Sequence, residues 1–290
     1  MKKESKEDKE RRLVFLRGVR KYITEELSKR TFPFYQLAKS GQALFGTGVL
    51  LQICDRTFAI SAAHVFDTVE EVLRLGDRAV IHTCDPAAPF LDISMWRVYK
   101  SKAPGGDRDA DKLDLAIAEI PAEATARLQH RRPVRLSEIQ ADERHQFNGR
   151  YLVFGYPKMG SRLEVSSNTL TYNILPYLTS MYQGQRGELP EYDNDLEIAL
   201  DFIPTDTTDH DGNPARMFDP KGISGCGIWR VFEAPSQMDH WDTGVLKLVG
   251  IEHSWDRQIQ VLRGARFRCA LVIIAQHYPE LRPALSVRYV

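Results

Sequence analysis

The sequence has few cysteines, no excess of charge of either sign and no long apolar run. Only four of its 290 residues are cysteine, and their positions do not form the paired spacing that is typical of metal ligands. We therefore predict buried free thiols, no metal site and no cofactor. No stretch of about 18 apolar residues occurs, so neither a membrane span nor a membrane partner is expected. The four cysteines are Cys54, Cys84, Cys226 and Cys269.

Charge is balanced over the whole chain. Lysine plus arginine and aspartate plus glutamate number 39 each, so the formal net charge is zero. Binding to nucleic acid is dominated by neutralisation of phosphates and usually leaves a basic excess, so no nucleic-acid partner is expected. Residues 1–12 are almost wholly charged and lead into no apolar segment of the signal-peptide type. These features together predict a cytoplasmic location.

Three short segments carry a candidate catalytic triad. They are Ala62–His64, Asp114–Ala116 and Gly222–Gly225, which contains Ser224. A serine hydroxyl is a poor nucleophile at neutral pH, so acyl transfer needs an imidazole to accept its proton and a carboxylate to orient the imidazole. The segments supply these groups in the order histidine, aspartate, serine, which is one of three known orders of this triad.

At these residues the chain resembles the trypsin-like (chymotrypsin-fold) serine protease superfamily, and most closely its bacterial intracellular members. The shared motifs are an Ala-Ala-His turn after a strand, an Asp-Leu-Ala strand start and a Gly-x-Ser-Gly nucleophile loop. Val153–Pro157 resembles the first strand of the family's second barrel, and Leu248–Ile251 resembles its cleft-lining strand. The resemblance covers residues 40 to 280.

The resemblance implies an all-β fold of two six-stranded antiparallel β-barrels. We expect residues 1–38 to form a charged N-terminal helical extension, which docks on the protein's own body rather than on a partner. Residues 39–140 would form the first barrel, with His64 and Asp114. Residues 141–290 would form the second barrel, with Ser224 and a C-terminal helix.

Hydrophobic periodicity agrees with this organisation. Apolar residues near a 3.6-residue stripe predict a helix within the first thirty residues, and Cys54-Asp55 reads as a tight hairpin turn. Residues 121–148 lack strand periodicity and are expected to connect the two barrels. Residues 266–278 are expected to form a terminal helix packed on the second barrel. Strands are predicted at residues 43–53, 56–60, 78–83, 93–99, 114–120, 151–155, 162–174, 196–203, 225–232, 245–253 and 258–262.

By the resemblance, the catalytic residues are His64, Asp114 and Ser224. Ser224 would attack a peptide carbonyl, His64 would carry the proton to the leaving amine, and Asp114 would stabilise the imidazolium. The backbone N–H groups of Gly222 and Ser224 would form the oxyanion hole.

The resemblance also suggests residues that contact the substrate. Phe218, six residues before the nucleophile, would lie at the base of the primary pocket and would not attract a basic side chain. The neighbouring Asp219 could point inward instead, so the cleaved residue is left open. Gly250 and Ile251 would line the cleft.

Two departures from the family bear on regulation and location. Ile223 stands where secreted zymogen relatives have an aspartate that pairs with a new amino terminus, and isoleucine cannot form that ion pair. We therefore predict no trypsin-style amino-terminal processing. The cysteines of the secreted family's disulfides are missing, since Val65 follows His64 and Pro220 lies four residues before Ser224. Cys226 is expected to pack as a small side chain under the nucleophile loop rather than to act as a redox switch.

Several features remain open at this level. His82 and His253 are alternative candidates for the general base. His82 lies in a strand pattern without a family match, and His253 follows the cleft strand, where a role at the rim is the other interpretation. The excursions at residues 183–195 and 206–214 could form lids or rims of the site, or could be decoration.

The leading functional hypothesis is a cytoplasmic serine endopeptidase that cuts one or a few protein substrates. The resemblance to bacterial proteins that act beside effectors adds a regulatory or effector protein as a possible partner. The alternative is a protease-fold binding or sensor module with little catalysis. An esterase of the α/β-hydrolase class is excluded because Cys226 occupies the position of the second glycine in Gly-x-Ser-x-Gly and because the triad order differs.

Overall fold

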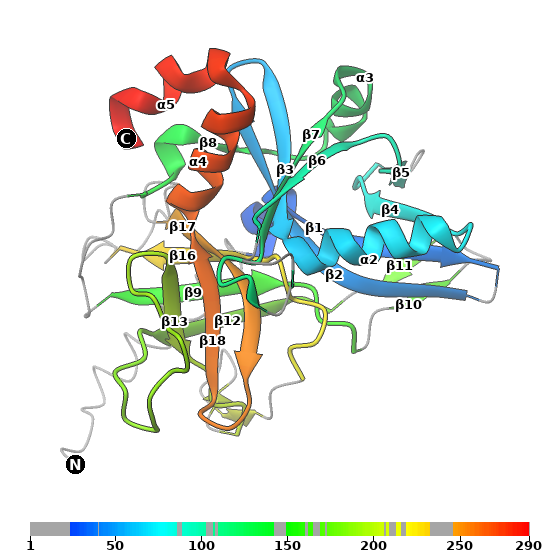
Figure 1. Cartoon of the computed structure of the whole chain (residues 1–290). Coiled ribbons are helices and arrows are strands. Elements are labelled where there is room, and N and C mark those ends of the chain that lie inside the picture. The colour runs from blue at the N-terminus through cyan, green and yellow to red at the C-terminus, as the bar shows by residue number, and fades with distance from the viewer. Residues whose placement is uncertain are drawn as a thin grey trace.

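The structure is a computed structural model of the chain that describes residues 24–39, 41–85, 89–102, 107, 110–141, 149–159, 162–164, 169–171, 173–205, 207–208, 213–215, 219–232 and 246–289. These residues form two curled antiparallel sheets and a few helices (Figure 1). The arrangement is consistent with a double β-barrel, which confirms the predicted fold class. None of the described helices combines the length and the apolar composition needed to cross a membrane.

The first sheet has eight strands, two more than predicted for the first barrel. Seven run in the order β5-β4-β1-β2-β3-β7-β6, and the short β8 pairs in parallel with β2. The predicted hairpin between β2 and β3 is present, and Cys54 in its turn has a positive φ of 54°. The bounds are β1 Thr31–Ala38, β2 Gly41–Ile53, β3 Arg56–Ala62, β4 Arg78–His82, β5 Phe90–Asp92, β6 Arg97–Lys100, β7 Leu115–Ile120 and β8 Val134–Arg135.

The second sheet has six strands, as many as predicted, in the order β12-β9-β16-β17-β18-β13. Five of them match predicted strands, but β12 was not predicted, and the strand predicted at residues 162–174 is instead the separate hairpin β10–β11. A bridge between Met181 and Leu200 links the end of β12 to β13, so the two edges of the sheet approach each other. Two short hairpins, β10–β11 and β14–β15, lie outside this sheet. The bounds are β9 Arg150–Gly155, β10 Arg162–Glu164, β11 Thr169–Thr171, β12 Leu175–Ser180, β13 Glu197–Asp201, β14 Thr207–Thr208, β15 Pro214–Ala215, β16 Gly227–Val231, β17 Leu246–Asp256 and β18 Val261–Arg266.

Residues 31–38, which were predicted to belong to the helical N-terminal extension, form strand β1 instead. Residues 24–30 are helical, whereas most of the predicted helical stripe lies outside the described residues. Phe32 and Phe34 on β1 are fully buried, and the strand lies between β2 and β4. Aromatic residues fit a pleated, buried surface better than the end of an exposed helix, so tertiary pairing decides the conformation here.

Helix α2, Ala63–Arg74, was not predicted, although the sequence does place His64 directly after a strand. The helix begins where β3 ends and buries one face. Its buried residues recur at a helical spacing, although no element was predicted for this part of the sequence. They are Ala63, Val65, Phe66, Val69 and Val72.

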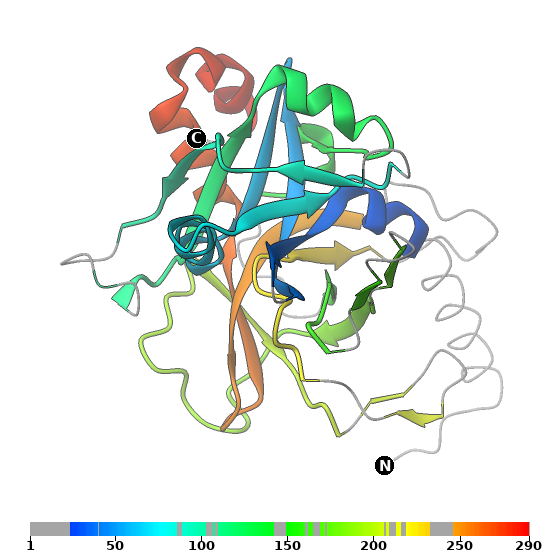
Figure 2. The ribbon, with the colours of Figure 1, turned by 90° about the vertical axis from the view of Figure 1, so that its right-hand side faces the viewer.

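The C-terminal helix is present as α4, Phe267–His277, close to the predicted bounds. A turn at Pro279–Leu281 and a second helix, α5 Arg282–Tyr289, follow it. The helix was predicted to pack on the second barrel. It packs on both sheets instead. Tyr278 makes edge-to-face contacts with Phe58 and Tyr99 of the first sheet. One buried cluster contains residues of α4 and of both sheets, and the helix lies beside β7 and β17 (Figure 1, Figure 2).

The connection between the sheets is ordered over its described part, residues 121–141. It contains the short helix α3, Ala122–Thr125, and strand β8. Arg131 is buried, and its guanidinium donates to the carbonyl oxygens of Ser28, Thr31 and His82. One buried cation therefore ties the N-terminal helix, β1 and β4 to the connection.

We expect a chain that lacks residues 1–40 to be unfolded. The deletion removes an interior strand together with two buried phenylalanines, and the loss of one buried phenylalanine side chain already costs about 3–5 kcal/mol. Domains of this kind are stable by only about 5–15 kcal/mol. Far-UV circular dichroism and solubility of the truncated chain provide the measurement. A cooperatively folded product would contradict the expectation and would reopen the possibility of processing near residue 40.

Candidate active site

His64 is the second residue of α2, and Asp114 caps the start of this helix from a distant part of the chain. The first N–H groups of a helix have no partner within it, and Ala62 provides no side-chain cap. The carbonyl of Asp114 accepts the N–H of Ala63 at 2.8 Å, and its Oδ1 accepts the N–H of His64 at 2.9 Å. The positive end of the helix dipole favours the carboxylate at this position.

The same carboxylate orients the imidazole ring. Asp114 Oδ2 lies 2.5 Å from His64 Nδ1, so Nδ1 carries the proton and Nε2 is left as the acceptor. The His64 side chain is 39% exposed and that of Asp114 only 13%. An imidazole that reaches solvent, backed by a shielded carboxylate, is the arrangement that a general base requires.

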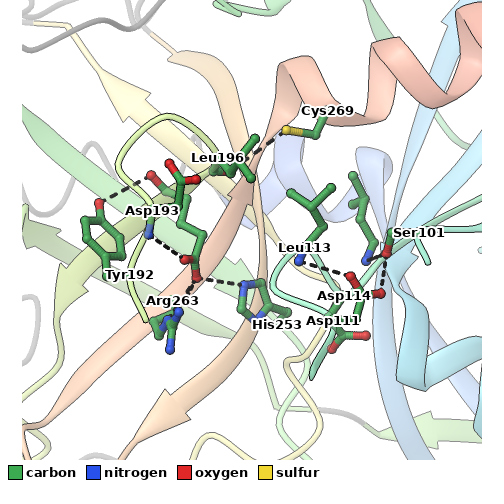
Figure 3. Close-up of polar contacts among 12 residues, drawn as sticks. Ser101, Asp111, Leu113, Asp114, Tyr192, Asp193, Leu196, His253, Arg263 and Cys269 are labelled. Carbon is green, nitrogen blue, oxygen red and sulfur yellow. Dashed lines mark hydrogen bonds and ion pairs between the residues drawn. The ribbon is translucent and has the colours of Figure 1, made fainter. Parts of the chain in front are cut away.

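Hydrogen bonds on both sides of Asp114 hold its backbone. Ser101 Oγ accepts the N–H of Leu115 at 2.9 Å and donates to Asp111 Oδ2 at 2.6 Å, while Asp111 Oδ1 accepts the N–H of Leu113 at 3.2 Å (Figure 3). Asp114 itself has a φ of 37°, in the left-handed region that most residues avoid. The surroundings thus impose a strained conformation on the residue that orients His64.

Ser224 is half-buried in the loop of residues 221–226, which we call the serine loop. This loop packs against β3, the strand that leads to His64. Thr47 on β2 donates its N–H to Ser224 O at 2.9 Å. A Cβ on Gly225 would lie 1.9 Å from Ser61 Oγ and 2.1 Å from Thr47 O, so only glycine fits. Ser61 precedes His64 by three residues, and this close packing brings the serine loop to the histidine. Among the described residues, no hydrogen bond joins His64 to Ser224 directly.

Two N–H groups of this loop donate to no protein group in the described chain, namely those of Gly222 and Ser224. Their directions are nevertheless set, because the peptide unit is planar and each N–H points opposite to the preceding carbonyl. Lys221 O accepts the N–H of Lys158 at 2.7 Å, and Ile223 O accepts the N–H of Cys226 at 2.8 Å. The loop therefore presents two oriented, unpaired donors beside Ser224.

Gly222 and Ile223 explain how the loop is accommodated. Gly222 has a φ of 97°, and a Cβ on it would lie 2.7 Å from the backbone nitrogen of Lys158. Ile223 is 1% exposed and belongs to the buried cluster inside the second sheet, where it lies against Gly155. The Ile223 side chain thus stabilises the loop by apolar burial.

A cavity of about 430 Å³ adjoins the His64–Asp114 pair. Its wall is formed by α2 and the segment before β7, by β17 and β18 of the second sheet, and by the excursion at residues 183–195, which the sequence left as either rim or decoration. Pro190 and Glu191 belong to this excursion, so it forms a wall of the site. The lining residues are His64, Ala110, Asp111, Lys112, Asp114, Pro190, Glu191, His253, Ser254 and Arg263.

A buried ion pair holds that wall in place. Arg263 on β18 contacts Glu197 Oε1 through Nε at 2.9 Å and through Nη2 at 2.6 Å, and its Nη1 donates to Pro190 O at 3.2 Å. Glu197 is fully buried and also accepts the N–H of Asp193 at 3.0 Å. Opposite, Lys112 lies 3.8 Å from Glu191, so a weak ion pair joins the segment before Asp114 to this wall.

The described residues that were predicted to contact the substrate do not line this cavity. Gly250 and Ile251 are buried within β17 and pair with β16 and β18. It is His253 and Ser254, farther along the same strand, that reach the cavity. Phe218 lies outside the described residues. Asp219 is described, and its carboxylate contacts Arg257 at 3.2 Å.

His82 and His253, the alternative candidates for the general base, have different surroundings. His82 lies on β4, where burial and Arg131 lower its pKa to about 4. His253 lines the cavity between Arg263 on one side and Asp111 and Asp114 on the other (Figure 3), and burial lowers its pKa to about 4. Both rings are therefore neutral at pH 7, and neither contacts a carboxylate as closely as His64 does. Within the described parts of the chain, no three histidine, cysteine, aspartate or glutamate side chains are grouped to hold a metal ion.

Glu252 is an unexpected feature of the site. Its carboxyl is almost fully buried, and Oε2 has no hydrogen-bond partner in the described chain. Burial, and secondarily the nearby Asp114, raise the pKa of Glu252 to about 8. Sequence patterns missed it, because a single acidic residue within an apolar strand carries no motif.

The free energy of unfolding should therefore depend on Glu252 between pH 4.5 and 8. Because its pKa rises on folding from the ordinary 4.5, the folded state holds the proton more tightly, and stability falls as pH rises through this window. Glu252→Gln removes this dependence, which amounts to at most about 1.4 kcal/mol per pH unit. Denaturant unfolding of both proteins at pH 5, 6.5 and 8 measures the difference, in which the contributions of His82 and His253 cancel. Equal pH slopes would contradict the expectation.

No family model and no curated protein matches this sequence. Among solved structures the chain is similar to the tobacco vein mottling virus protease, with 7% identity, a TM-score of 0.41 and coverage of 83% of this chain and 77% of that chain. It is similar to the inactive form of the Rv3671c protease, with 15% identity, a TM-score of 0.45 and coverage of 91% and 94%. It is also similar to Deg5, with 13% identity, a TM-score of 0.48 and coverage of 96% and 99%.

Proposed function

We propose that this chain is a trypsin-like serine endopeptidase that hydrolyses peptide bonds in one or a few protein targets. The contact of 2.5 Å between His64 Nδ1 and Asp114 Oδ2 carries the proposal. It lies beside a serine loop with two unpaired N–H donors, and together these groups meet the needs of acyl transfer.

In the proposed reaction Ser224 Oγ attacks the scissile carbonyl carbon. His64 Nε2 takes the hydroxyl proton and passes it to the leaving amine as the C–N bond breaks, which leaves an acyl group on Ser224. A water molecule then attacks the acyl carbon, His64 takes its proton, and Ser224 leaves with that proton restored. Asp114 keeps the ring in the required tautomer and stabilises the imidazolium.

The oxyanion of each tetrahedral intermediate would be held by the N–H groups of Gly222 and Ser224. Their directions are set before substrate binds, so little reorganisation is needed as charge develops. His64 and Ser224 share no hydrogen bond in the free chain, but such contacts are often long without substrate and tighten in the complex.

The cavity beside His64 is the proposed site for substrate residues that flank the scissile bond. It is lined by α2 and the segment before β7 from the first half of the chain and by β17 and β18 from the second half, and the excursion carrying Pro190 and Glu191 adds to its wall. A polypeptide in extended conformation fits a cleft with this construction, which favours a protein substrate that is selected by several side chains.

We also propose a cytoplasmic location and activity without amino-terminal processing. All four cysteines are free thiols, as expected in a reducing compartment, although only Cys226 and Cys269 are buried as predicted, because Cys54 lies in an exposed hairpin turn and Cys84 is half-buried. Ile223 stabilises the serine loop by burial instead of by an ion pair with a new amino terminus. A regulatory or effector protein partner, as suggested by the resemblance to bacterial intracellular proteins, is part of the proposal.

The second candidate function is a protease-fold binding module with little catalysis. The observation that favours it is the absence, in the described residues, of a hydrogen bond between His64 and Ser224. Without that contact the hydroxyl is not activated at rest.

Labelling with a fluorophosphonate probe separates the two candidates. We expect one adduct, located on Ser224 by peptide mass spectrometry, and none on Ser224→Ala. A comparison of new protein termini in cells that express either form would then identify substrates. Well-folded wild-type protein that gives no adduct across a range of pH would refute the endopeptidase and leave the binding module.

A further inference from the structure

Thr47 forms two hydrogen bonds with the serine loop, although it belongs to none of the sequence motifs. It lies on β2, is fully buried, and was not predicted to take part in the site. Its N–H donates to Ser224 O at 2.9 Å, and its hydroxyl donates to Gly222 O at 3.0 Å while accepting the N–H of Tyr156 at 3.2 Å. Its own carbonyl accepts the hydroxyl of Ser61 at 2.6 Å.

With these contacts, the four consecutive main-chain carbonyls of residues 221–224 all accept hydrogen bonds. Lys221 O and Ile223 O are bound within the second half of the chain, by Lys158 N–H and Cys226 N–H. The other two carbonyls, those of Gly222 and Ser224, both accept hydrogen bonds from Thr47. All four carbonyls of residues 221–224 are therefore hydrogen-bonded, and one residue of the first sheet supplies half of their donors.

The hydroxyl matters most at Gly222. The Lys221 carbonyl sets the direction of the Gly222 N–H. A glycine with a φ of 97° has wide conformational freedom, so the peptide units before and after it keep their relative orientation best while both of their carbonyls are held. Lys158 N–H holds one of them and the Thr47 hydroxyl holds the other. Branching at Cβ restricts the rotation of a threonine side chain and keeps its hydroxyl on target.

We propose that Thr47 is a positioning residue for the reaction: its hydroxyl holds the Gly222 carbonyl, and so keeps the oxyanion donors of the serine loop in place from the first sheet without a charged partner. The inference rests on the proposed function. It explains how a loop with Ile223 in place of an acidic residue keeps its working shape, since neutral hydrogen bonds and apolar burial replace an ion pair.

The variants Thr47→Val and Thr47→Ser test this inference. Valine keeps the shape but leaves Gly222 O and Tyr156 N–H without partners, whereas serine restores the hydroxyl. Because the loss of a whole oxyanion donor costs about 100- to 1000-fold, we expect a disordered donor in Thr47→Val to slow labelling by a fluorophosphonate about 10- to 100-fold. Thr47→Ser should recover most of the rate.

Ser61→Ala is the matched control, because it removes a buried hydrogen bond to Thr47 O and touches none of the loop carbonyls. It should lower the unfolding midpoint, as Thr47→Val does, without a comparable loss of labelling. Equal labelling of folded Thr47→Val and wild type overturns the inference while the proposed function stands. The inference is also overturned if Thr47→Ser is labelled as slowly as Thr47→Val. It is overturned as well if Ser61→Ala loses as much of the labelling rate as Thr47→Val.

Hydrogen exchange gives a second readout that does not depend on catalysis. The N–H groups of Ile223, Gly225 and Cys226 are hydrogen-bonded in the loop and should exchange faster in Thr47→Val than in Ser61→Ala. Equal protection in the two variants overturns the inference even if Ser224 never reacts. Absence of labelling in the wild type refutes the proposed function, and the role of Thr47 in the reaction falls with it.

Discussion

Replacement of Ser224 by alanine is expected to lower peptide hydrolysis by about a millionfold. The change removes the atom that forms the acyl intermediate, and no other hydroxyl of the described loop can take its place. Binding and the oxyanion donors would remain, so a residual acceleration over the uncatalysed reaction of about 1000- to 10,000-fold is expected.

The loss should occur without a change in fold. The contacts of Ser224 that stabilise the loop are made by its main-chain oxygen, which alanine retains. The measurement is cleavage of a peptide substrate together with the unfolding midpoint of both proteins. Ser254→Ala is the matched control, since this serine lines the cavity but lies in β17 and has no triad role. A Ser224→Ala protein that keeps more than about a thousandth of the activity would contradict the mechanism, because the hydroxyl would then not be the nucleophile.

Replacement of Asp114 by asparagine is expected to lower turnover by about 10,000-fold. Asparagine is nearly isosteric and is a good helix cap, so its oxygen can still accept the N–H of His64. Its amide nitrogen, however, would face His64 Nδ1 and donate to it. The ring would then carry its proton on Nε2, the atom that must accept the proton of Ser224.

Asp111→Asn provides the control for this prediction. Asp111 is also shielded and lies in the same segment, but its carboxylate bonds Ser101 and the N–H of Leu113 rather than His64. We expect a much smaller loss, because the change affects only the support of the Asp114 backbone. Equal losses in the two variants would show that the segment's shape, and not the tautomer of His64, is what matters.

The candidate triad could be read from the sequence because each member lies in a short local motif. A glycine next to a serine, or an aspartate at the start of a strand, reflects a backbone requirement that neighbouring residues reveal. The structure brings His64 and Asp114 into contact, as their motifs predict. The close approach of Gly225 to Ser61 likewise follows from the glycine in the nucleophile motif.

The residues that support the site could not be found in this way. Thr47, Ser101 and Glu252 gain their roles only from partners far away in the chain. Each is unremarkable in its own strand or loop. The same is true of β1, whose place between β2 and β4 depends on pairing across long sequence separations.

Strand periodicity and the local motifs, with the family resemblance that they carry, were enough to predict the all-β class, the candidate catalytic residues and their order, and the small number of cysteines was enough to predict free thiols. The side chains that hold the serine loop, the place of the cavity and the carboxyl that keeps its proton became known from the folded structure alone. Such properties depend on distance, burial and hydrogen bonding between segments that are remote in sequence. The contact between Thr47 and Gly222, which joins two sheets across 175 positions of the chain, is the clearest example.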